Sequence, residues 1–154
     1  MKRYITVLLA VVMTLTLASC GKITYPDLPD DAIAFEMGKF VDPNDDAAEY
    51  GTIEYEGRTY IGYGTLDNSF HKKGIDRCVG YIIMDENSSS FTDLSDKSRR
   101  VYTFVGDTNH DYLMDRDIST TLMNQPYVWR AIDTQGTDAP TFDYIESLEY
   151  AYWN

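Results

Sequence analysis

The clearest structural pattern in this chain spans residues 52–63, Thr52-Ile53-Glu54-Tyr55-Glu56-Gly57-Arg58-Thr59-Tyr60-Ile61-Gly62-Tyr63. Ile53 and Tyr55 share one face, because successive side chains of a β-strand point to opposite sides of the sheet. Ile61 and Tyr63 share a face in the same way on the return strand. Glu56-Gly57 lies between the two runs and suits a tight two-residue turn. The stretch therefore predicts a β-hairpin.

Apolar and alternating runs elsewhere predict further strands. They lie at residues 79–84, 100–105, 112–114 and 127–132, and the tail 148–153 alternates in the same way. Short helices are indicated at two places only. Asp117 or Ser119 can cap a helix over residues 117–124, and Pro140 suits the first turn of a helix over residues 140–148.

Aromatic side chains supply much of the material for a core. Residues 20–154 contain 21 Leu, Ile and Val residues and 20 aromatic residues. Such side chains suit the pleated surface of a sheet. The predicted fold is therefore mainly β, either a β-sandwich or a partly open barrel, with one or two short helices.

The N-terminus carries a different pattern. A cationic start, Met1-Lys2-Arg3, precedes an apolar run at residues 5–17, which ends in Leu17-Ala18-Ser19-Cys20-Gly21. At about 13 residues the run is short for a membrane-spanning helix and typical of a secretory signal. The segment resembles the type II signal peptide and lipobox of bacterial lipoprotein precursors. The resemblance implies cleavage before Cys20 and a diacylglyceryl group on its thiol. A retained membrane anchor, or an ordinary signal with an incidental cysteine, is the alternative.

This resemblance divides the chain into three parts. Residues 1–19 are expected to be a cleaved signal peptide, residues 20–31 the lipidated cysteine and a tether, and residues 32–154 a single β-rich domain. Pro26 and Pro29 stiffen the tether, which at about 3.1 Å per residue would hold the domain roughly 30 Å from the lipid. Two or three acyl chains on Cys20, palmitate among them, anchor a protein stably in a bilayer. We expect an outward-facing protein at a bacterial cell membrane, or a periplasmic or outer-membrane location where the host has two membranes.

The charge of the chain limits its partners. The formal net charge is -12, and residues 20–154 hold 11 basic and 25 acidic side chains. Phosphate groups repel such a chain, so its acidity argues against nucleic acid and against anionic lipid as partners. We therefore expect the partner to be a protein, an envelope polymer or a small ligand.

A polar stretch at residues 106–118 has the spacing of a calcium loop. Its candidate oxygen ligands stand at loop positions 1, 3, 5 and 9 and are Asp107, Asn109, Asp111 and Asp115. Calcium prefers six to eight oxygen ligands. The stretch resembles the loops of EF-hand and dockerin-type modules, but Tyr112 replaces the usual glycine and Ile118 replaces the final acid. The alternative is a plain polar turn between two strands. Calcium is the only cofactor that the sequence suggests.

Catalytic residues are harder to assemble. Cys78 has no cysteine partner once Cys20 carries lipid, and it lies in an apolar run typical of a buried, inert thiol. Nucleophilic catalysis needs a base and an orienting acid. The two histidines, His71 and His110, are not placed beside Cys78 by any motif. An extracytoplasmic enzyme that uses Cys78 or paired carboxylates is therefore the alternative function.

Residues 127–130 offer a candidate binding surface. Tyr127 and Trp129 share one strand face, and Arg130 lies on the other face with Val128 and Ile132. Aromatic rings can stack on a sugar or a peptide, although such rings more commonly build the core. Tyr127, Trp129 and Arg130 are therefore candidates for ligand binding.

These features together predict a class of function. The chain is expected to be a membrane-anchored extracytoplasmic lipoprotein whose β-domain binds or scaffolds another molecule. Besides the enzyme, a calcium-stabilised structural module is an alternative. The sequence names no ligand.

Overall fold

The structure of the protein is a computed structural model that describes residues 25–67, 70, 72–83, 97–119, 125–139 and 141–154. These residues contain nine strands: β1 (Ile33–Phe35), β2 (Gly38–Asp42), β3 (Asp45–Tyr55), β4 (Arg58–Leu66), β5 (Ile75–Ile82), β6 (Arg99–Phe104), β7 (Tyr112–Asp117), β8 (Tyr127–Ala131) and β9 (Ile145–Ser147). They also contain three single-turn 3-10 helices: η1 (Lys72–Gly74), η2 (Ile132–Thr134) and η3 (Ala151–Trp153). None of the helices in the described residues is long and apolar enough to cross a bilayer.

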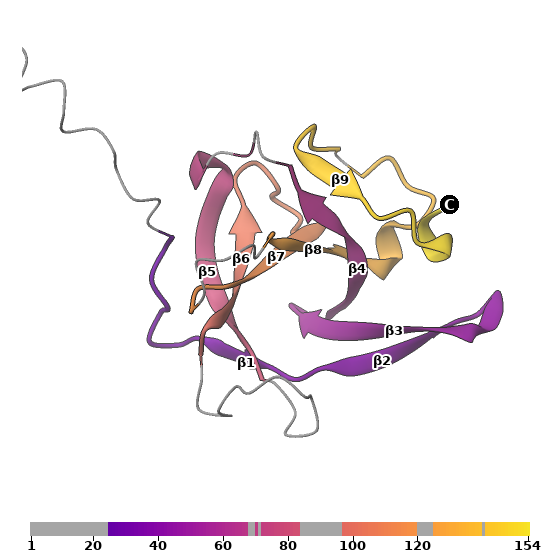
Figure 1. Ribbon diagram of the computed structural model, residues 1–154, viewed down its shortest axis with the longest axis horizontal. Helices are drawn as coiled ribbons and strands as arrows, with labels where there is room; N and C mark the ends of the chain where they lie inside the picture. Colours follow the sequence, from indigo (N-terminus) through magenta and orange to yellow (C-terminus); the bar gives the residue numbers. More distant parts are fainter. Residues whose placement is uncertain (1–24, 68–69, 71, 84–96, 120–124, 140) are drawn as a thin grey trace, which may run out of the picture.

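All nine strands belong to one sheet that curls into a barrel. Its order is β1-β5-β6-β7-β8-β4-β3-β2, and β9 pairs with β4. β1 and β2 stand at opposite ends of this order, yet only Glu36 and Met37 separate them in the chain. The sheet must therefore curl so that its two edges approach each other, as Figure 1 shows. The prediction of a mainly β fold, in its form as a partly open barrel, is confirmed.

The hairpin at residues 52–63 is confirmed as β3 and β4. Ile53 pairs with Tyr60, and Tyr55 pairs with Arg58. Glu56 and Gly57 form the turn, with φ values of 50° and 76°. Positive φ at both central residues gives the turn that matches the twist of a two-stranded ribbon.

Both faces of the curled sheet are packed. One cluster includes residues from strands at both ends of the sheet order, so it fills the concave interior; its members are Phe35, Ile53, Tyr55, Tyr60, Val79, Ile82, Val101, Leu113, Trp129 and Ala131. The second cluster lies on the outer face and consists of Leu66, Ile75, Cys78, Tyr102, Phe104, Tyr112, Met114 and Val128. Tyr102 and Phe104 thus share a face, as period two predicts.

Two peripheral segments differ from their predicted structure. The helix expected at residues 140–148 is instead a turn followed by β9, whose residues pair with Gly64, Thr65 and Leu66 at the end of β4. The tail is a loop and η3 instead of a strand, and the Trp153 indole N–H donates to the Gly62 carbonyl at 2.8 Å. In both places a long-range contact outweighs the local pattern. The helix expected at 117–124 falls mainly on residues 120–124, which lie outside the described residues.

The segment expected to be a tether is partly packed on the barrel. Tyr25 and Leu28 cover the outer cluster. The Tyr25 ring lies 5.6 Å from the Tyr102 ring, and the Arg116 guanidinium lies 4.5 Å from the Tyr25 ring centre and donates to its hydroxyl. The packed part of the chain therefore begins N-terminal to residue 32.

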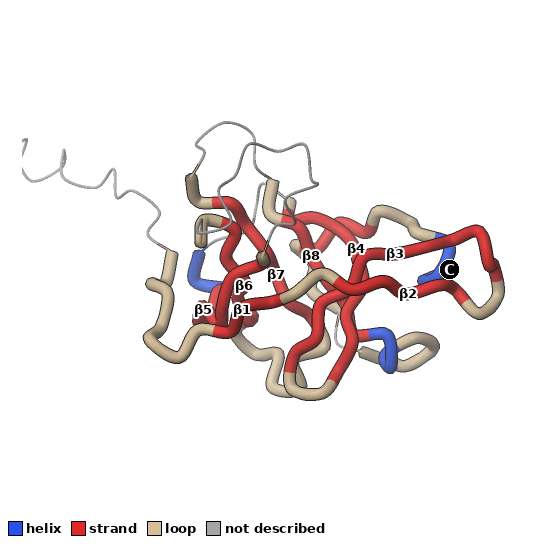
Figure 2. The backbone as a smooth tube through the Cα atoms, turned by 90° about the horizontal axis from the view of Figure 1, so that it is seen from below, coloured by secondary structure: helices blue, strands red, loops and turns tan. Residues whose placement is uncertain are grey.

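The barrel is open along one line, which we call the seam. β1 pairs with β5 only at residues 80–82, and β2 pairs with β3 only as far as Thr52. The first half of β5 and the end of β3 therefore approach each other without a paired strand between them among the described residues. Figure 2 shows the same barrel from below.

Candidate functional site

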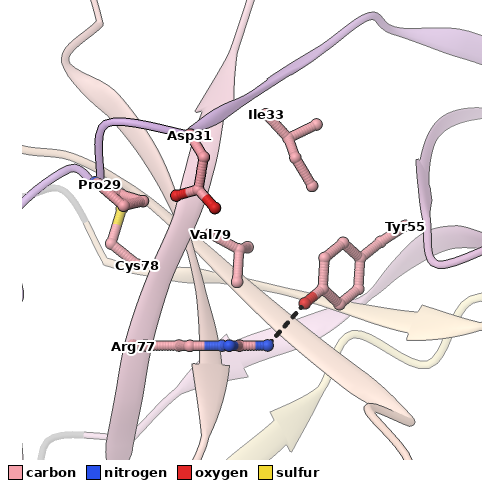
Figure 3. A pocket seen from close by; sticks show the side chains of 7 residues that line it. All are labelled: Pro29, Asp31, Ile33, Tyr55, Arg77, Cys78 and Val79. Carbon is pink, nitrogen blue, oxygen red and sulfur yellow. Dashed lines mark hydrogen bonds between the residues drawn. The ribbon is translucent and has the colours of Figure 1, made fainter.

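A small pocket of about 170 Å³ lies at the seam. Its walls come from the N-terminal segment, β1, the end of β3 and the first half of β5; the lining residues are Pro29, Asp31, Ile33, Tyr55, Arg77, Cys78 and Val79 (Figure 3). The chain bends between β1 and β2, so β1 lies away from β3. The pocket occupies the space that this bend leaves. The sequence holds no local signal for this pocket, because four separate segments build it.

The polar groups of the pocket suit a small polar ligand. The exposed Arg77 guanidinium donates to the Tyr55 hydroxyl at 3.3 Å, and its other N–H groups can serve a ligand. Burial raises the pKa of Tyr55, which keeps this hydroxyl protonated at neutral pH. Asp31 adds a carboxylate on the opposite wall. The arrangement can orient a ligand by hydrogen bonds, with apolar contacts from Ile33 and Val79.

Cys78 is placed poorly for nucleophilic chemistry. Its side chain is 4% exposed and belongs to the outer cluster, and its Sγ lies 3.5 Å from the Gly80 carbonyl oxygen. Burial raises the pKa of the Cys78 thiol, so the reactive thiolate is disfavoured. No histidine is among the residues that line the pocket beside it. These observations argue against a thiol-based enzyme.

Asp107 holds together the loop that was a candidate calcium site. The Asp111 N–H donates to its Oδ1 at 3.0 Å, and the Tyr112 N–H donates to its Oδ2 at 2.8 Å. Gly106 and His110 have φ values of 87° and 52°, which bring these amides onto the carboxylate. Burial raises the pKa of Asp107, although both hydrogen bonds oppose this shift.

The other candidate calcium ligands have partners in different directions. Asp111 Oδ1 accepts from Arg58 at 3.0 Å, and the same guanidinium binds the backbone carbonyl of Asn109, not its side chain, at 2.6 Å. Asp115 accepts from the Arg99 guanidinium at 2.9 Å. Among the described residues, no group of three or more His, Cys, Asp and Glu side chains could hold a metal ion. The four candidates therefore do not converge, and calcium binding stays a prediction.

Tyr127, Trp129 and Arg130 do not form one surface. Trp129 lies in the barrel interior, 3% exposed, where its indole N–H donates to Asp115 at 2.6 Å. The Tyr127 ring packs against it at 5.2 Å. Arg130 points to the outer face, as its place in the alternation predicts. None of the aromatic side chains in the described ranges is exposed, which counts against an aromatic binding platform.

Arg130 is enclosed by aromatic rings. Its guanidinium lies 4.8 Å from the ring centre of Trp153, 5.2 Å from Tyr63 and 5.6 Å from Tyr112. It also donates to the Thr134 hydroxyl at 2.8 Å. Cation–π contacts of this kind stabilise a partly buried guanidinium. Arg130 thus ties η3 to the outer face of the barrel.

Cys20, the candidate lipidation site, lies outside the described residues. No family model matches this chain, no curated protein matches it, and no solved structure matches it. Its function is therefore argued from its own residues. Of the positions considered, the seam pocket is the one that combines an accessible cation, a hydroxyl and apolar walls.

Proposed function

We propose that the protein is a lipid-anchored extracytoplasmic binding protein. Leu17-Ala18-Ser19-Cys20 at the end of a secretory signal carries this proposal. The lipid holds a folded domain at the membrane surface, and the domain then meets its partner outside the membrane.

Binding is favoured over catalysis by the packing of the barrel. Side chains fill its interior, so a ligand must be bound at the surface. The seam pocket offers Arg77 and the Tyr55 hydroxyl at such a surface position. Cys78, the candidate nucleophile, is buried with a raised thiol pKa. The seam pocket is therefore our choice for the ligand site.

The anchor is tested with Cys20→Ala in the producing bacterium. We expect the wild-type chain to incorporate an isotope-labelled fatty acid and to stay in the membrane fraction until detergent is added, because two or three acyl chains give stable anchoring. The Cys20→Ala chain should incorporate no fatty acid. Cys78→Ala removes the other cysteine and is the matched control, which should label like wild type. Equal labelling of the Cys20→Ala chain would contradict the proposal, and so would an unlabelled wild-type chain.

A further inference from the structure

The distance between the proposed lipid and the barrel is short. Tyr25 is held on the outer face by Tyr102 and Arg116, so only the four residues 21–24 separate it from Cys20. Even fully extended, the five Cα–Cα steps from Cys20 to Tyr25 span no more than about 18 Å. This is well below the reach expected for a free tether of residues 20–31. The face that holds Tyr25 is therefore kept close to the lipid headgroups.

Basic side chains gather on this face. Arg100 on β6 pairs with Arg116 on β7 and with Tyr81 on β5, so the three side chains share the outer face. The Lys97 ammonium lies 5.0 Å from the Tyr81 ring centre, and the Arg100 guanidinium donates to the Lys97 carbonyl at 3.1 Å. Arg116 contacts Tyr25. We call Lys97, Arg100 and Arg116 the basic patch.

No ion pair found among the described residues includes a residue of the basic patch. The five ion pairs found there involve other cationic residues, such as Arg58 and Arg99. Lys97, Arg100 and Arg116 are in none of these five pairs, so the patch brings three cationic side chains together on one face. This local excess differs from the sign of the whole chain, whose net charge is -12.

The acidic residues gather at the other end of the molecule. β2 and β3 form a ribbon that projects away from the side where the described chain begins, in both views (Figures 1 and 2). Residues 38–55 of this ribbon hold five acidic side chains and one basic side chain, Lys39, which pairs with Glu49 at 2.7 Å. In contrast, the described residues on the side of Tyr25, 25–31, 72–83 and 97–117, hold seven basic and eight acidic side chains. The ribbon is therefore the more acidic end of the molecule.

We propose that the basic patch docks on the anionic headgroups of the bilayer that holds the lipid anchor, with the β2–β3 ribbon pointing away from the membrane. This inference rests on the proposed lipidation of Cys20. Basic residues close to an anionic surface are attracted within a Debye length, about 8 Å at physiological salt. The same surface repels the acidic ribbon, so attraction and repulsion favour one orientation. Each basic residue of the patch should strengthen docking about fivefold.

Energy transfer to acceptor lipids in vesicles tests this orientation. The lipidated full chain is placed in vesicles of phosphatidylcholine, with or without phosphatidylglycerol, and one donor dye is attached by Ile118→Cys or Ala47→Cys. Ile118 donates its N–H to Ser98 beside the patch, and Ala47 lies exposed on the ribbon. We expect phosphatidylglycerol to raise the transfer from residue 118 and to lower it from residue 47. High salt should reverse both changes.

Two double variants with equal changes in net charge separate docking from general repulsion. Lys97→Gln/Arg100→Gln should lose the rise at residue 118, because docking weakens about 25-fold at fivefold per charge. Lys39→Gln/Asn44→Asp makes the same change on the ribbon and should keep the rise. A fall in transfer at both dye positions, or a patch variant that behaves like wild type, would overturn the docking proposal alone. A chain that does not float with the vesicles would overturn the lipid anchor and the docking with it.

Discussion

Asp107 combines the sequence position of a predicted calcium ligand with the contacts of a residue that holds its own loop together. Its place in an Asp-rich loop matches the first position of a calcium site. In the structure both of its oxygens accept backbone N–H groups, from Asp111 and Tyr112. The side chain is 3% exposed, so no water can replace these partners if it is removed. An Asp-rich spacing therefore fits either role, and only the direction of each oxygen separates them.

We expect Asp107→Ala to lower the free energy of unfolding by about 3 kcal/mol, because it removes two charge-assisted hydrogen bonds and leaves buried N–H groups unpaired. Urea unfolding measures this loss, with the exposed Thr108→Ala as a control in the same loop that should change little. The loss should be equal in EDTA and in millimolar calcium. A calcium-dependent stabilisation of the wild-type chain that disappears in Asp107→Ala would instead support a metal site.

At the scale of elements, β1 decides how the barrel closes. It is only three residues long, and its pairing with β5 depends on close approach at Gly80. A Cβ atom at Gly80 would lie 2.0 Å from the Ile33 carbonyl oxygen and 2.8 Å from the Phe35 ring. No side chain fits at these distances, so glycine is required there for β1 to pair.

Gly80→Ala should therefore detach β1 and widen the seam. We expect a loss of about 3 kcal/mol in the free energy of unfolding, because the Phe35 side chain leaves the interior cluster. Hydrogen exchange at the Ile83 amide, which donates to the Phe35 carbonyl, should become faster. Gly51→Ala is the matched control: its Cβ would meet only the flexible end of Met37. Equal protection of the Ile83 amide in both variants would show that β1 tolerates the added methyl group.

At the scale of the whole molecule, Arg58 joins three separate parts at one end of the barrel. It begins β4, and its guanidinium donates to Asp133 in η2 at 2.6 Å and to Asp111 before β7 at 3.0 Å. The hairpin turn is joined to the same loop by Glu56, which lies 2.9 Å from His110 Nδ1. Carboxylates thus hold together segments that are far apart in the chain.

This end of the barrel should make the fold sensitive to acid. The hydrogen bond from Arg58 lowers the pKa of Asp133, and the hydrogen bond to His110 lowers the pKa of Glu56. A carboxyl group with a lowered pKa in the folded state stabilises the fold above its unfolded pKa, about 4, and loses this contribution as the pH falls through its folded pKa. We expect the thermal midpoint to fall steadily below about pH 4.

Asp133→Asn tests the Arg58–Asp133 contact, which has more hydrogen bonds than the contact between Glu56 and His110. This variant should lower the midpoint at neutral pH and flatten its decline in acid, because one of the titrating groups is gone. Asp138→Asn removes an exposed carboxylate from the same region and should leave the acid decline unchanged. Identical pH profiles for Asp133→Asn and wild type would remove Asp133 from this explanation. Both contacts are partly exposed, so high salt should weaken the effect.

The sequence by itself determined the parts of this protein that depend on neighbouring residues. Alternation placed Tyr102 with Phe104 on one face, and Trp129 and Arg130 on opposite faces. The turn at Glu56-Gly57 followed from local backbone chemistry. The anchor pattern at Cys20 is also local, and its lipidation is a prediction.

Only the tertiary structure decided what depends on residues far apart in the chain. Barrel closure by β1 and β2, the pairing of β9 with β4 and the seam pocket each require a long-range contact. The same is true of the partners of the acidic side chains: a carboxylate has the same sequence pattern whether its oxygens face a cation, a backbone amide or a metal ion. Composition fixes the net charge of the chain, but folding decides where the charged side chains lie. The curled sheet carries β6 and β7, with the basic patch, to the side of Tyr25, and it leaves the acidic β2–β3 ribbon at the opposite end.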